Sequence, residues 1–176
     1  MILIQKNFIK PKESDLLLDS IKEIGSPPNL AEDDHSTGYY SKSALLESDV
    51  FAYGIFNEIC ERVLGLAEKV FDLSLELDQA TLIKVIPGNT TEEHADSQNL
   101  DGTPKTGCSN FLISAVAYLN DDFTGGDLVF PTMKHRYKPV PGDCVIFPSH
   151  LQYSHYVDSV FSGERISLAM WFSGVY

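Results

Sequence analysis

Apolar residues in the first 72 positions recur every three or four residues, which is the spacing of an amphipathic helix. One such run starts at Ser14, a residue type that favours the N-cap position, and stops at Gly25. A longer run starts near Ser48 and continues to Val70. We therefore expect two helices, each of which needs another layer to cover its apolar face. The segment 25–43 between them contains proline, acidic and tyrosine residues and predicts an irregular loop.

After Leu73 the pattern changes to short runs rich in β-branched and aromatic residues, bounded by Gly, Pro and Asp. The predicted strands are 80–86, 111–119, 127–130, 136–140, 143–148, 155–160 and 165–173. Short strands at this spacing are typical of a sandwich or barrel. Gly125-Gly126 and Gly142-Asp143 predict tight turns between strands. The polar segment 97–107 predicts a long loop, of the kind that often covers a site as a lid.

A chain of 176 residues, 43% of them hydrophobic, is long enough to bury a core without disulfides or structural metals. We expect one domain over residues 1–176, with a helical part to about residue 72 and a β core from about residue 73. The 25 acidic and 13 basic side chains give a net charge of −12. Nucleic acid is therefore not expected as a partner, because phosphate contacts require clustered Lys and Arg.

Cysteine usage and the absence of long apolar runs indicate a compartment. Cys60, Cys108 and Cys144 are widely spaced, and the chain has no Cys-x-x-Cys pair. This usage favours a reducing, cytoplasmic setting. No run approaches the ~20 apolar residues that span a bilayer, so no membrane partner is expected. The oligomeric state stays open.

Candidate chemistry begins with His94-Ala95-Asp96. In an extended segment, residues i and i+2 point to the same face, so this imidazole and this carboxylate can reach one metal ion. A His-x-Asp sequence is common by chance, and a solvated turn is its alternative interpretation. His155, about sixty residues later, supplies a third ligand, and two His with one carboxylate form the facial triad of non-haem Fe(II) oxygenases. His150 competes with His155 for that place.

The last predicted strand alternates between two kinds of side chain. One face carries Ile166, Leu168, Met170 and Phe172, and the other carries Arg165, Ser167, Ala169 and Trp171. The second face is a poor hydrophobic surface but suits a pocket wall. A buried Arg165 needs an anion, and each charge-assisted hydrogen bond to a carboxylate is worth about 1.5–3 kcal/mol. The alternative is a surface salt bridge with Glu164 or Asp158.

A series of motifs runs from about Thr81 to Phe172, over half the chain. They are Pro87-Gly88-Asn89, His94-Ala95-Asp96, Ala117-Tyr118-Leu119-Asn120, Gly125-Gly126-Asp127-Leu128-Val129-Phe130-Pro131, Pro141-Gly142-Asp143, Phe147-Pro148-Ser149, His155 with Arg165 ten residues later, Ser167, and Trp171-Phe172. In this order and spacing they resemble the Fe(II)/2-oxoglutarate-dependent dioxygenases of the prolyl 4-hydroxylase-like branch. The resemblance implies a mainly β fold with N-terminal helices, a double-stranded β-helix or cupin-like jelly roll.

The resemblance also implies roles for individual side chains. These are iron ligation for His94, Asp96 and His155, binding of 2-oxoglutarate for Arg165, Tyr118 and Ser167, and substrate contact for Trp171. The ten-residue step to Arg165 favours His155 over His150. Packing in the core is the alternative for Tyr118 and for Trp171. His35 and His135 are expected on the surface.

The activity that the resemblance implies is hydroxylation of proline in a peptide or protein, with decarboxylation of 2-oxoglutarate to succinate and carbon dioxide. It requires Fe(II) and dioxygen, and it admits ascorbate as a reductant. Tyr39, Tyr40, Trp171 and the segment 97–107 are the available pieces of an aromatic substrate groove. One alternative is the same chemistry on a small molecule or another side chain. The other is a non-catalytic cupin-like binding module.

Two positions depart from the commonest pattern of the branch. Ile86 stands where a tyrosine often precedes Pro-Gly, which puts detailed substrate or cosubstrate contacts in doubt. Arg165 stands where the collagen-type members carry lysine, and it fits the bacterial and oxygen-sensing members better.

Overall fold

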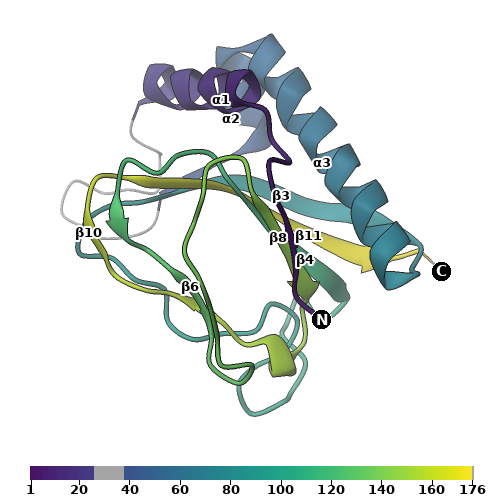
Figure 1. The fold of residues 1–176 in the computed structure, drawn as a ribbon. Coiled ribbons are helices and arrows are strands. Elements are labelled where there is room, and N and C mark those ends of the chain that lie inside the picture. The colour runs from purple at the N-terminus through teal and green to yellow at the C-terminus, as the bar shows by residue number, and fades with distance from the viewer. Residues whose placement is uncertain (26–37, 176) are drawn as a thin grey trace.

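The computed structural model describes residues 1–25 and 38–175, and in that part of the chain the helices lie against one face of an antiparallel sheet (Figure 1). The helices are α1 (Pro11–Ile24), α2 (Lys42–Ser48) and α3 (Val50–Phe71), with a 3-10 turn at Leu151–Tyr153. The strands are β1 (Leu3–Gln5), β2 (Gly38–Tyr40), β3 (Leu75–Val85), β4 (Phe111–Tyr118), β5 (Thr124–Gly125), β6 (Leu128–Phe130), β7 (His135–Tyr137), β8 (Cys144–Pro148), β9 (Tyr156–Val157), β10 (Val160–Ser162) and β11 (Arg165–Gly174). The predicted class, mainly β with N-terminal helices, is confirmed.

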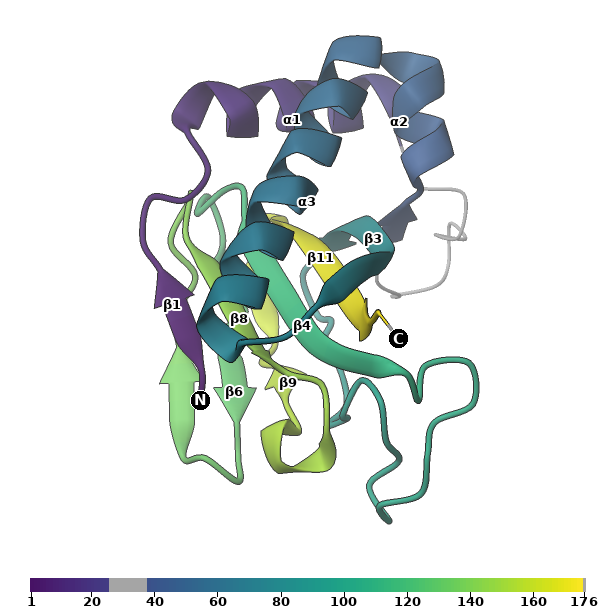
Figure 2. The same cartoon turned by 90° about the vertical axis from the view of Figure 1, so that its right-hand side faces the viewer.

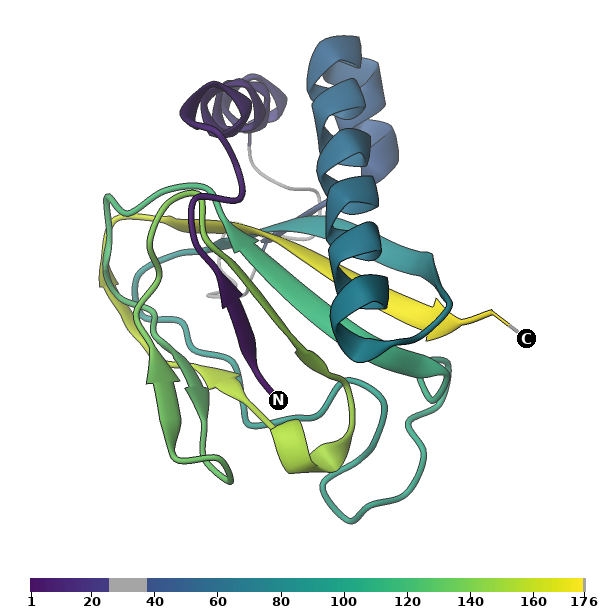
Figure 3. The same cartoon turned by 45° about the vertical axis from the view of Figure 1, so that its right-hand side comes forward.

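Six strands form the main sheet in the order β1-β8-β4-β11-β3-β2. Two smaller sheets have the orders β7-β6-β9 and β10-β5. The helices cover one face of the main sheet, and the smaller sheets lie on its other side (Figures 1 and 3). Figure 2 shows α3 running across the main sheet over β4 and β8. This two-layered β arrangement leaves an interior surface of the main sheet on which a site can be built.

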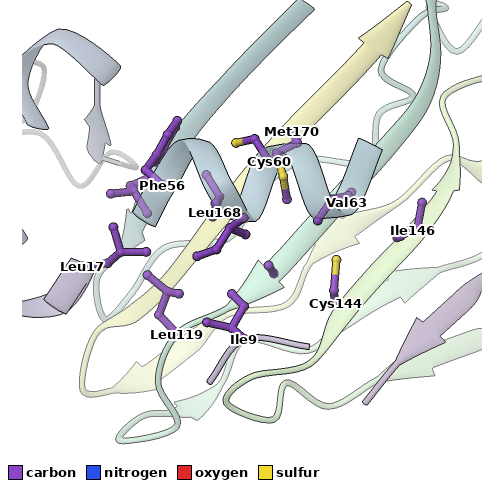
Figure 4. Close-up of a cluster of buried hydrophobic side chains, with 14 of the residues drawn as sticks. Ile9, Leu17, Phe56, Cys60, Val63, Leu119, Cys144, Ile146, Leu168 and Met170 are labelled. Atoms are coloured by element: carbon purple, nitrogen blue, oxygen red, sulfur yellow. The ribbon is translucent and has the colours of Figure 1, made fainter. Parts of the chain in front are cut away.

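The alternation predicted for the last strand is present in β11. Ile166, Leu168, Met170 and Phe172 belong to the hydrophobic core beneath the helices, together with Phe56, Ile59, Cys60 and Val63 of α3. Figure 4 shows Phe56, Cys60 and Val63 of the helix in one cluster with Leu168 and Met170 of the strand. Each fully buried aliphatic or aromatic side chain of this kind stabilises the fold by roughly 1.5–3 kcal/mol. The opposite face of β11 is consequently turned away from the helices.

The first helix begins earlier than predicted. Its N-cap is Lys10 and its first residue is Pro11, so Ser14 is buried inside the first turn and is not the cap. Proline suits the first helical position because its ring fixes φ and it has no N–H to leave unpaired. The carboxylate of Glu13 accepts the backbone N–H of Lys10 at 2.9 Å and two hydrogen bonds from Arg62.

The long helix starts close to the predicted position. Ser48 ends the short helix α2, and Asp49 caps α3 by accepting the backbone N–H groups of Phe51 and Ala52. Acidic caps of this kind both satisfy free N–H groups and complement the helix dipole. The short helix α2 was not predicted, because its seven residues give too little apolar periodicity.

Several strands differ from the prediction at the sheet edges. β1 and β2 were not predicted, because three-residue strands show no periodicity, and β3 starts at Leu75 instead of residue 80. The predicted strand 155–160 is divided into β9 and β10, which pair with β6 and β5 respectively. Of the predicted loop 25–43, residues 38–43 contain β2 and the start of α2. Residues 26–37, including His35, lie outside the described residues.

The N-terminal segment is attached to the β core through the buried carboxylate of Asp143. This carboxylate accepts hydrogen bonds from Lys6 at 2.6 Å, from the backbone N–H of Asn7 at 3.0 Å and from the Tyr137 hydroxyl at 2.7 Å. Burial alone would raise the pKa of Asp143, but these hydrogen bonds outweigh it and hold the pKa below its usual value.

Among the helices of the described residues, none has the length and hydropathy of a membrane span.

Candidate active site

A cavity of about 150 Å³ lies on the face of the main sheet that is turned away from the helices. Arg165, Ser167, Ala169 and Trp171 of β11 all line it, as the predicted pocket face requires. His94, Asp96 and His155 line the same cavity, which also takes apolar walls from β3, β4 and β8. The structure therefore brings all the predicted iron and Arg165 positions together around one space.

Backbone pairing joins the two segments that carry the candidate ligands. The N–H of His94 donates to the carbonyl of His155 at 2.9 Å, and the reverse hydrogen bond measures 2.8 Å. The N–H of Asp96 donates to the carbonyl of Ser149 at 3.1 Å. Pairing between segments about sixty residues apart is what places the His-x-Asp pair beside the later histidine.

The three candidate ligands have the spacing of a metal centre. Nε2 of His94 lies 3.6 Å from Oδ1 of Asp96, and Nε2 of His155 lies 4.0 Å from Oδ2 of Asp96. The three ligand atoms all lie within 4.8 Å of one another, and this is the only such group among the described residues. Histidine nitrogens and carboxylate oxygens lie about 2.0–2.2 Å from a divalent metal such as zinc, so two atoms that bind the same ion lie up to about 4 Å apart. The 3.6 Å and 4.0 Å distances from Asp96 to the two histidines fall within this limit. His150 is exposed and does not belong to the group.

Backbone carbonyls fix both imidazole rings in the tautomer that a metal needs. Nδ1 of His94 lies 2.8 Å from the carbonyl oxygen of Glu92, and Nδ1 of His155 lies 3.1 Å from that of Tyr153. A carbonyl can only accept, so each Nδ1 carries the hydrogen and each Nε2 presents its lone pair to the cluster. Burial lowers the pKa of His155, which favours the neutral ring.

Arg165 is buried without an anion. Its Nε donates to the carbonyl of Gly126 at 3.1 Å, and its Nη1 donates to Oγ of Ser167 at 3.2 Å. The two carboxylates that could have neutralised it are used elsewhere, because Glu164 pairs with Lys84 at 2.6 Å and Asp158 pairs with Arg136 at 2.7 Å. The alternative of a surface salt bridge is therefore wrong. Arg165 is only 2% exposed, and within residues 1–25 and 38–175 no carboxylate lies within 4.0 Å of it.

Tyr118 adds an unused donor beside this arginine. The guanidinium carbon of Arg165 lies 5.1 Å from the centre of the Tyr118 ring, and Tyr118 pairs with Ser167 in the register of β4 and β11. The Tyr118 hydroxyl is buried and has no hydrogen-bond partner among the described residues. Burial raises the pKa of Tyr118 to about 12, so the phenol keeps its proton. A buried, unpaired hydroxyl costs about 1–3 kcal/mol, which a bound acceptor removes.

Gly126 does more than turn the chain. It was predicted as part of a tight turn, but its carbonyl is the acceptor for Arg165 Nε, and Gly125 belongs to β5. Gly126 has a φ of +68°, and a Cβ built on it would lie 2.9 Å from Cδ of Arg165. Only glycine combines this backbone conformation with this close approach.

The aromatic pieces proposed for a substrate groove have different positions. Tyr39 and Trp171 both line the cavity, and Tyr39 is 47% exposed. Tyr40 is buried and donates its hydroxyl to the carbonyl of Gly25, so its assignment to the groove is wrong. Trp171 is partly exposed and stacks on Phe111, with 6.2 Å between the ring centres.

The 97–107 loop lies next to the ligand cluster. The N–H of Lys105 donates to the carbonyl of Ser97, and its ammonium donates to the carbonyl of Ala95 at 3.3 Å. The side chain of Gln98 accepts the backbone N–H of Leu151. Sequence reasoning gave no role to Lys105, because nothing in the local pattern distinguishes it from a surface lysine. The role of this loop as a lid stays a prediction.

With the fold and the site in place, residues 80–173 match the model of the 2OG-Fe(II) oxygenase superfamily. The match covers more than half of the chain, and the chain belongs to this superfamily. By the name of the family, its members are oxygenases that work with Fe(II) and 2-oxoglutarate.

Individual relatives agree with this placement. Human prolyl 3-hydroxylase 3 is 33% identical over 138 residues, which is 65% of this chain and 18% of that protein. The viral collagen prolyl hydroxylase vCPH from Paramecium Bursaria Chlorella virus-1, solved as a 2OG complex, has a TM-score of 0.75 at 17% identity and covers 99% of this chain and 96% of its own. A Pseudomonas putida prolyl-4-hydroxylase has a TM-score of 0.70 at 21% identity over 99% of this chain and 93% of its own. The two solved structures confirm the predicted double-stranded β-helix.

Proposed function

We propose that this chain is an Fe(II)- and 2-oxoglutarate-dependent hydroxylase of proline in a peptide or protein. One observation carries the proposal: a buried His-Asp-His cluster and a buried arginine without an anion line the same cavity. The relatives named above are prolyl hydroxylases, which supports proline as the target. Their names include both the 3 and the 4 position, so the position of hydroxylation is left to the assay.

The residues present fit both groups that the family implies. His94, Asp96 and His155 offer two neutral imidazoles and one carboxylate, which is the donor set of non-haem Fe(II) oxygenases. Arg165 and the unpaired hydroxyl of Tyr118 offer a charge and a free donor to one end of a dicarboxylate. When bound, iron with 2-oxoglutarate and dioxygen supplies the oxidation of an unactivated C–H bond, with release of succinate and carbon dioxide.

The chain's own residues can hold 2-oxoglutarate between the ligand cluster and Arg165. Ser114 of β4 donates to Asp96, and Tyr118 lies four residues further along the same strand. At the rise of a β-strand, the Cα atoms of Ser114 and Tyr118 are roughly 13 Å apart. A dicarboxylate can therefore extend from the ligand cluster towards Arg165 and leave the intervening apolar wall in contact with its methylenes. The tautomers fixed by Glu92 and Tyr153 spare the ligands any rearrangement when metal enters.

The mouth of the cavity suits a ring-containing side chain. Tyr39 and Trp171 present aromatic surface to the same cavity that holds the ligand cluster. A pyrrolidine ring packs well on aromatic faces, and a proline-containing peptide in an extended polyproline conformation is already ordered before it binds. Trp171 is thus proposed as a substrate contact, and Tyr39 as a second aromatic contact in the same cavity.

The test incubates purified protein with Fe(II), 2-oxoglutarate and dioxygen, with and without ascorbate, and measures succinate together with the substrate mass. Proline-rich peptides, free proline and peptides without proline are compared, and Asp96→Ala is the inactive control. A gain of one oxygen atom on proline-containing peptides alone supports the proposal. Oxidation of free proline or of another side chain would establish one alternative function. No succinate with any substrate and no metal binding would favour the binding module.

A further inference from the structure

The carboxylate of Asp96 is held from the interior of the sheet by two buried hydroxyls. Oγ of Ser114, on β4, lies 2.6 Å from Oδ2 of Asp96, and Oγ of Ser149 lies 2.7 Å from Oγ of Ser114. Ser114 is 2% exposed and Ser149 is 1% exposed. An ionised carboxylate can only accept, so Ser114 donates to Asp96 and Ser149 donates to Ser114.

Ser149 also holds the backbone that carries the ligand. Its carbonyl accepts the N–H groups of Asp96 at 3.1 Å and Ser97 at 3.0 Å, and it accepts the Ser97 hydroxyl at 3.0 Å. Its own N–H donates to the carbonyl of Leu112, which is in β4. The backbone that carries the hydroxyl behind Ser114 is therefore held by hydrogen bonds to both the ligand segment and β4.

From these contacts we infer that Ser114 is a positioning residue for Asp96, with Ser149 acting through it. The inference rests on the proposed function, since it concerns the same metal site. The Ser114 hydroxyl donates to Oδ2, which lies 4.0 Å from Nε2 of His155, and leaves Oδ1, which lies 3.6 Å from Nε2 of His94, as the oxygen without a hydrogen-bond donor among the described residues. With Oδ2 held by Ser114, Asp96 would offer Oδ1 to a bound metal.

The test is an anaerobic titration with Mn(II), followed by electron paramagnetic resonance, on the purified full chain without 2-oxoglutarate. Ser114→Ala should weaken Mn(II) binding by roughly 10–100-fold, the usual effect of removing an outer partner of a ligand. Ser149→Ala should weaken it less, and the double variant Ser114→Ala/Ser149→Ala should match Ser114→Ala alone, because the Ser149 hydroxyl contacts Asp96 only through Ser114, and alanine keeps the backbone hydrogen bond to Asp96. Ser114→Thr keeps the hydroxyl and should restore binding.

A matched control separates positioning from stability. Ser20 is also a buried serine that contacts an aspartate carboxylate, with its Oγ 3.3 Å from Oδ2 of Asp49, but it lies in α1 on the helical side of the sheet. Ser20→Ala should lower the unfolding temperature as Ser114→Ala does and leave Mn(II) affinity unchanged. If Ser114→Ala folds poorly, Ser149→Ala carries the test, because its hydroxyl is one step further from the ligand.

Wild-type Mn(II) affinity in Ser114→Ala would overturn the positioning role and leave the proposed function standing. Additive losses in the double variant would overturn the action of Ser149 through Ser114. A wild-type chain that binds no Mn(II) would overturn the proposed function, and the positioning role with it.

Discussion

The two ends of the cavity treat their polar groups in opposite ways. At the ligand cluster, the chain itself partners every atom that does not face the metal position: Nδ1 of both histidines and Oδ2 of Asp96. At the other end, Arg165 lines the cavity without a carboxylate, and the hydroxyl of Tyr118, which lies beside Arg165, has no acceptor among the described residues. The first end is organised before anything binds. The second end is completed by an anion, because Arg165 has only neutral acceptors and the buried Tyr118 hydroxyl has no acceptor among the described residues.

The two ends of the site therefore contribute differently to protein stability and to ligand binding. A preorganised ligand cluster loses little conformational freedom when the metal binds, so most of the interaction free energy appears as affinity. The unsatisfied end destabilises the empty protein, and binding of a carboxylate relieves that cost. Changes at the two ends should therefore have separate effects on metal binding, cosubstrate binding and folding.

The largest expected effect breaks the ligand cluster. His155→Ala removes a ligand whose other ring nitrogen is fixed by Tyr153, and we expect Fe(II) affinity to fall by more than ~100-fold, beyond the loss from an outer partner. Turnover should disappear with it. The measurement is an anaerobic Fe(II) titration with 2-oxoglutarate, followed by the visible charge-transfer band.

The matched control is His150→Ala, because His150 is exposed and stands outside the cluster. It should bind iron as the wild type does. A charge-transfer band of normal intensity in His155→Ala would contradict the ligand assignment.

A second prediction concerns the end of the cavity that carries Arg165. Arg165→Ala should weaken 2-oxoglutarate binding by about 10–150-fold, which corresponds to the 1.5–3 kcal/mol of a charge-assisted hydrogen bond. Metal affinity without cosubstrate should stay within about threefold, because Arg165 makes no hydrogen bond to the ligand cluster. Isothermal titration of the Mn(II)-loaded protein with 2-oxoglutarate measures the cosubstrate affinity, and titration of the metal-free protein with Mn(II) measures the metal affinity.

Arg136→Ala controls for the loss of one positive charge, since Arg136 is exposed and pairs with Asp127 and Asp158. Equal losses of cosubstrate affinity in the two variants would mean that general charge, and not the cavity, attracts the anion.

A third, smaller effect separates the contribution of Tyr118 to cosubstrate binding from its contribution to protein stability. Tyr118→Phe removes the unpaired hydroxyl, so the empty protein should become more stable by about 1 kcal/mol while 2-oxoglutarate binds roughly fivefold to tenfold more weakly. Urea unfolding without ligands and a cosubstrate titration of the metal-loaded protein report the two quantities. A destabilised Tyr118→Phe variant would show that the hydroxyl has a partner in the folded chain.

The smallest effect on the site is expected from a polar cluster elsewhere. The pKa of Asp143 is lowered in the folded protein, so its hydrogen bonds stabilise the fold above the unfolded pKa, and this contribution is lost as the pH falls through the lower folded pKa. Asp143→Asn should therefore reduce stability at pH 7 and flatten the loss of stability on acidification below about pH 4. Urea unfolding across this pH range checks it, and metal affinity should not change.

Local patterns in the sequence carried much of the fold. The alternation in residues 165–173 correctly separated the core face from the cavity face, because a strand reverses its side chains at every residue regardless of its neighbours. The helical periodicity also found the apolar stripes of α1 and α3. It placed the start of α3 within two residues but started α1 too late, because the turn from Lys10 to Glu13 is fixed by hydrogen bonds that apolar spacing does not record.

What the sequence determined by itself was therefore local: the faces of the long elements, and the motif order that identified the family. Only the tertiary structure decided which distant groups meet. The pairing of His94 with His155, the use of Glu164 and Asp158 by other cations, and the two serines behind Asp96 all depend on closure of the chain over tens of residues. Such contacts follow from sheet register and packing between layers, and no short-range pattern encodes them.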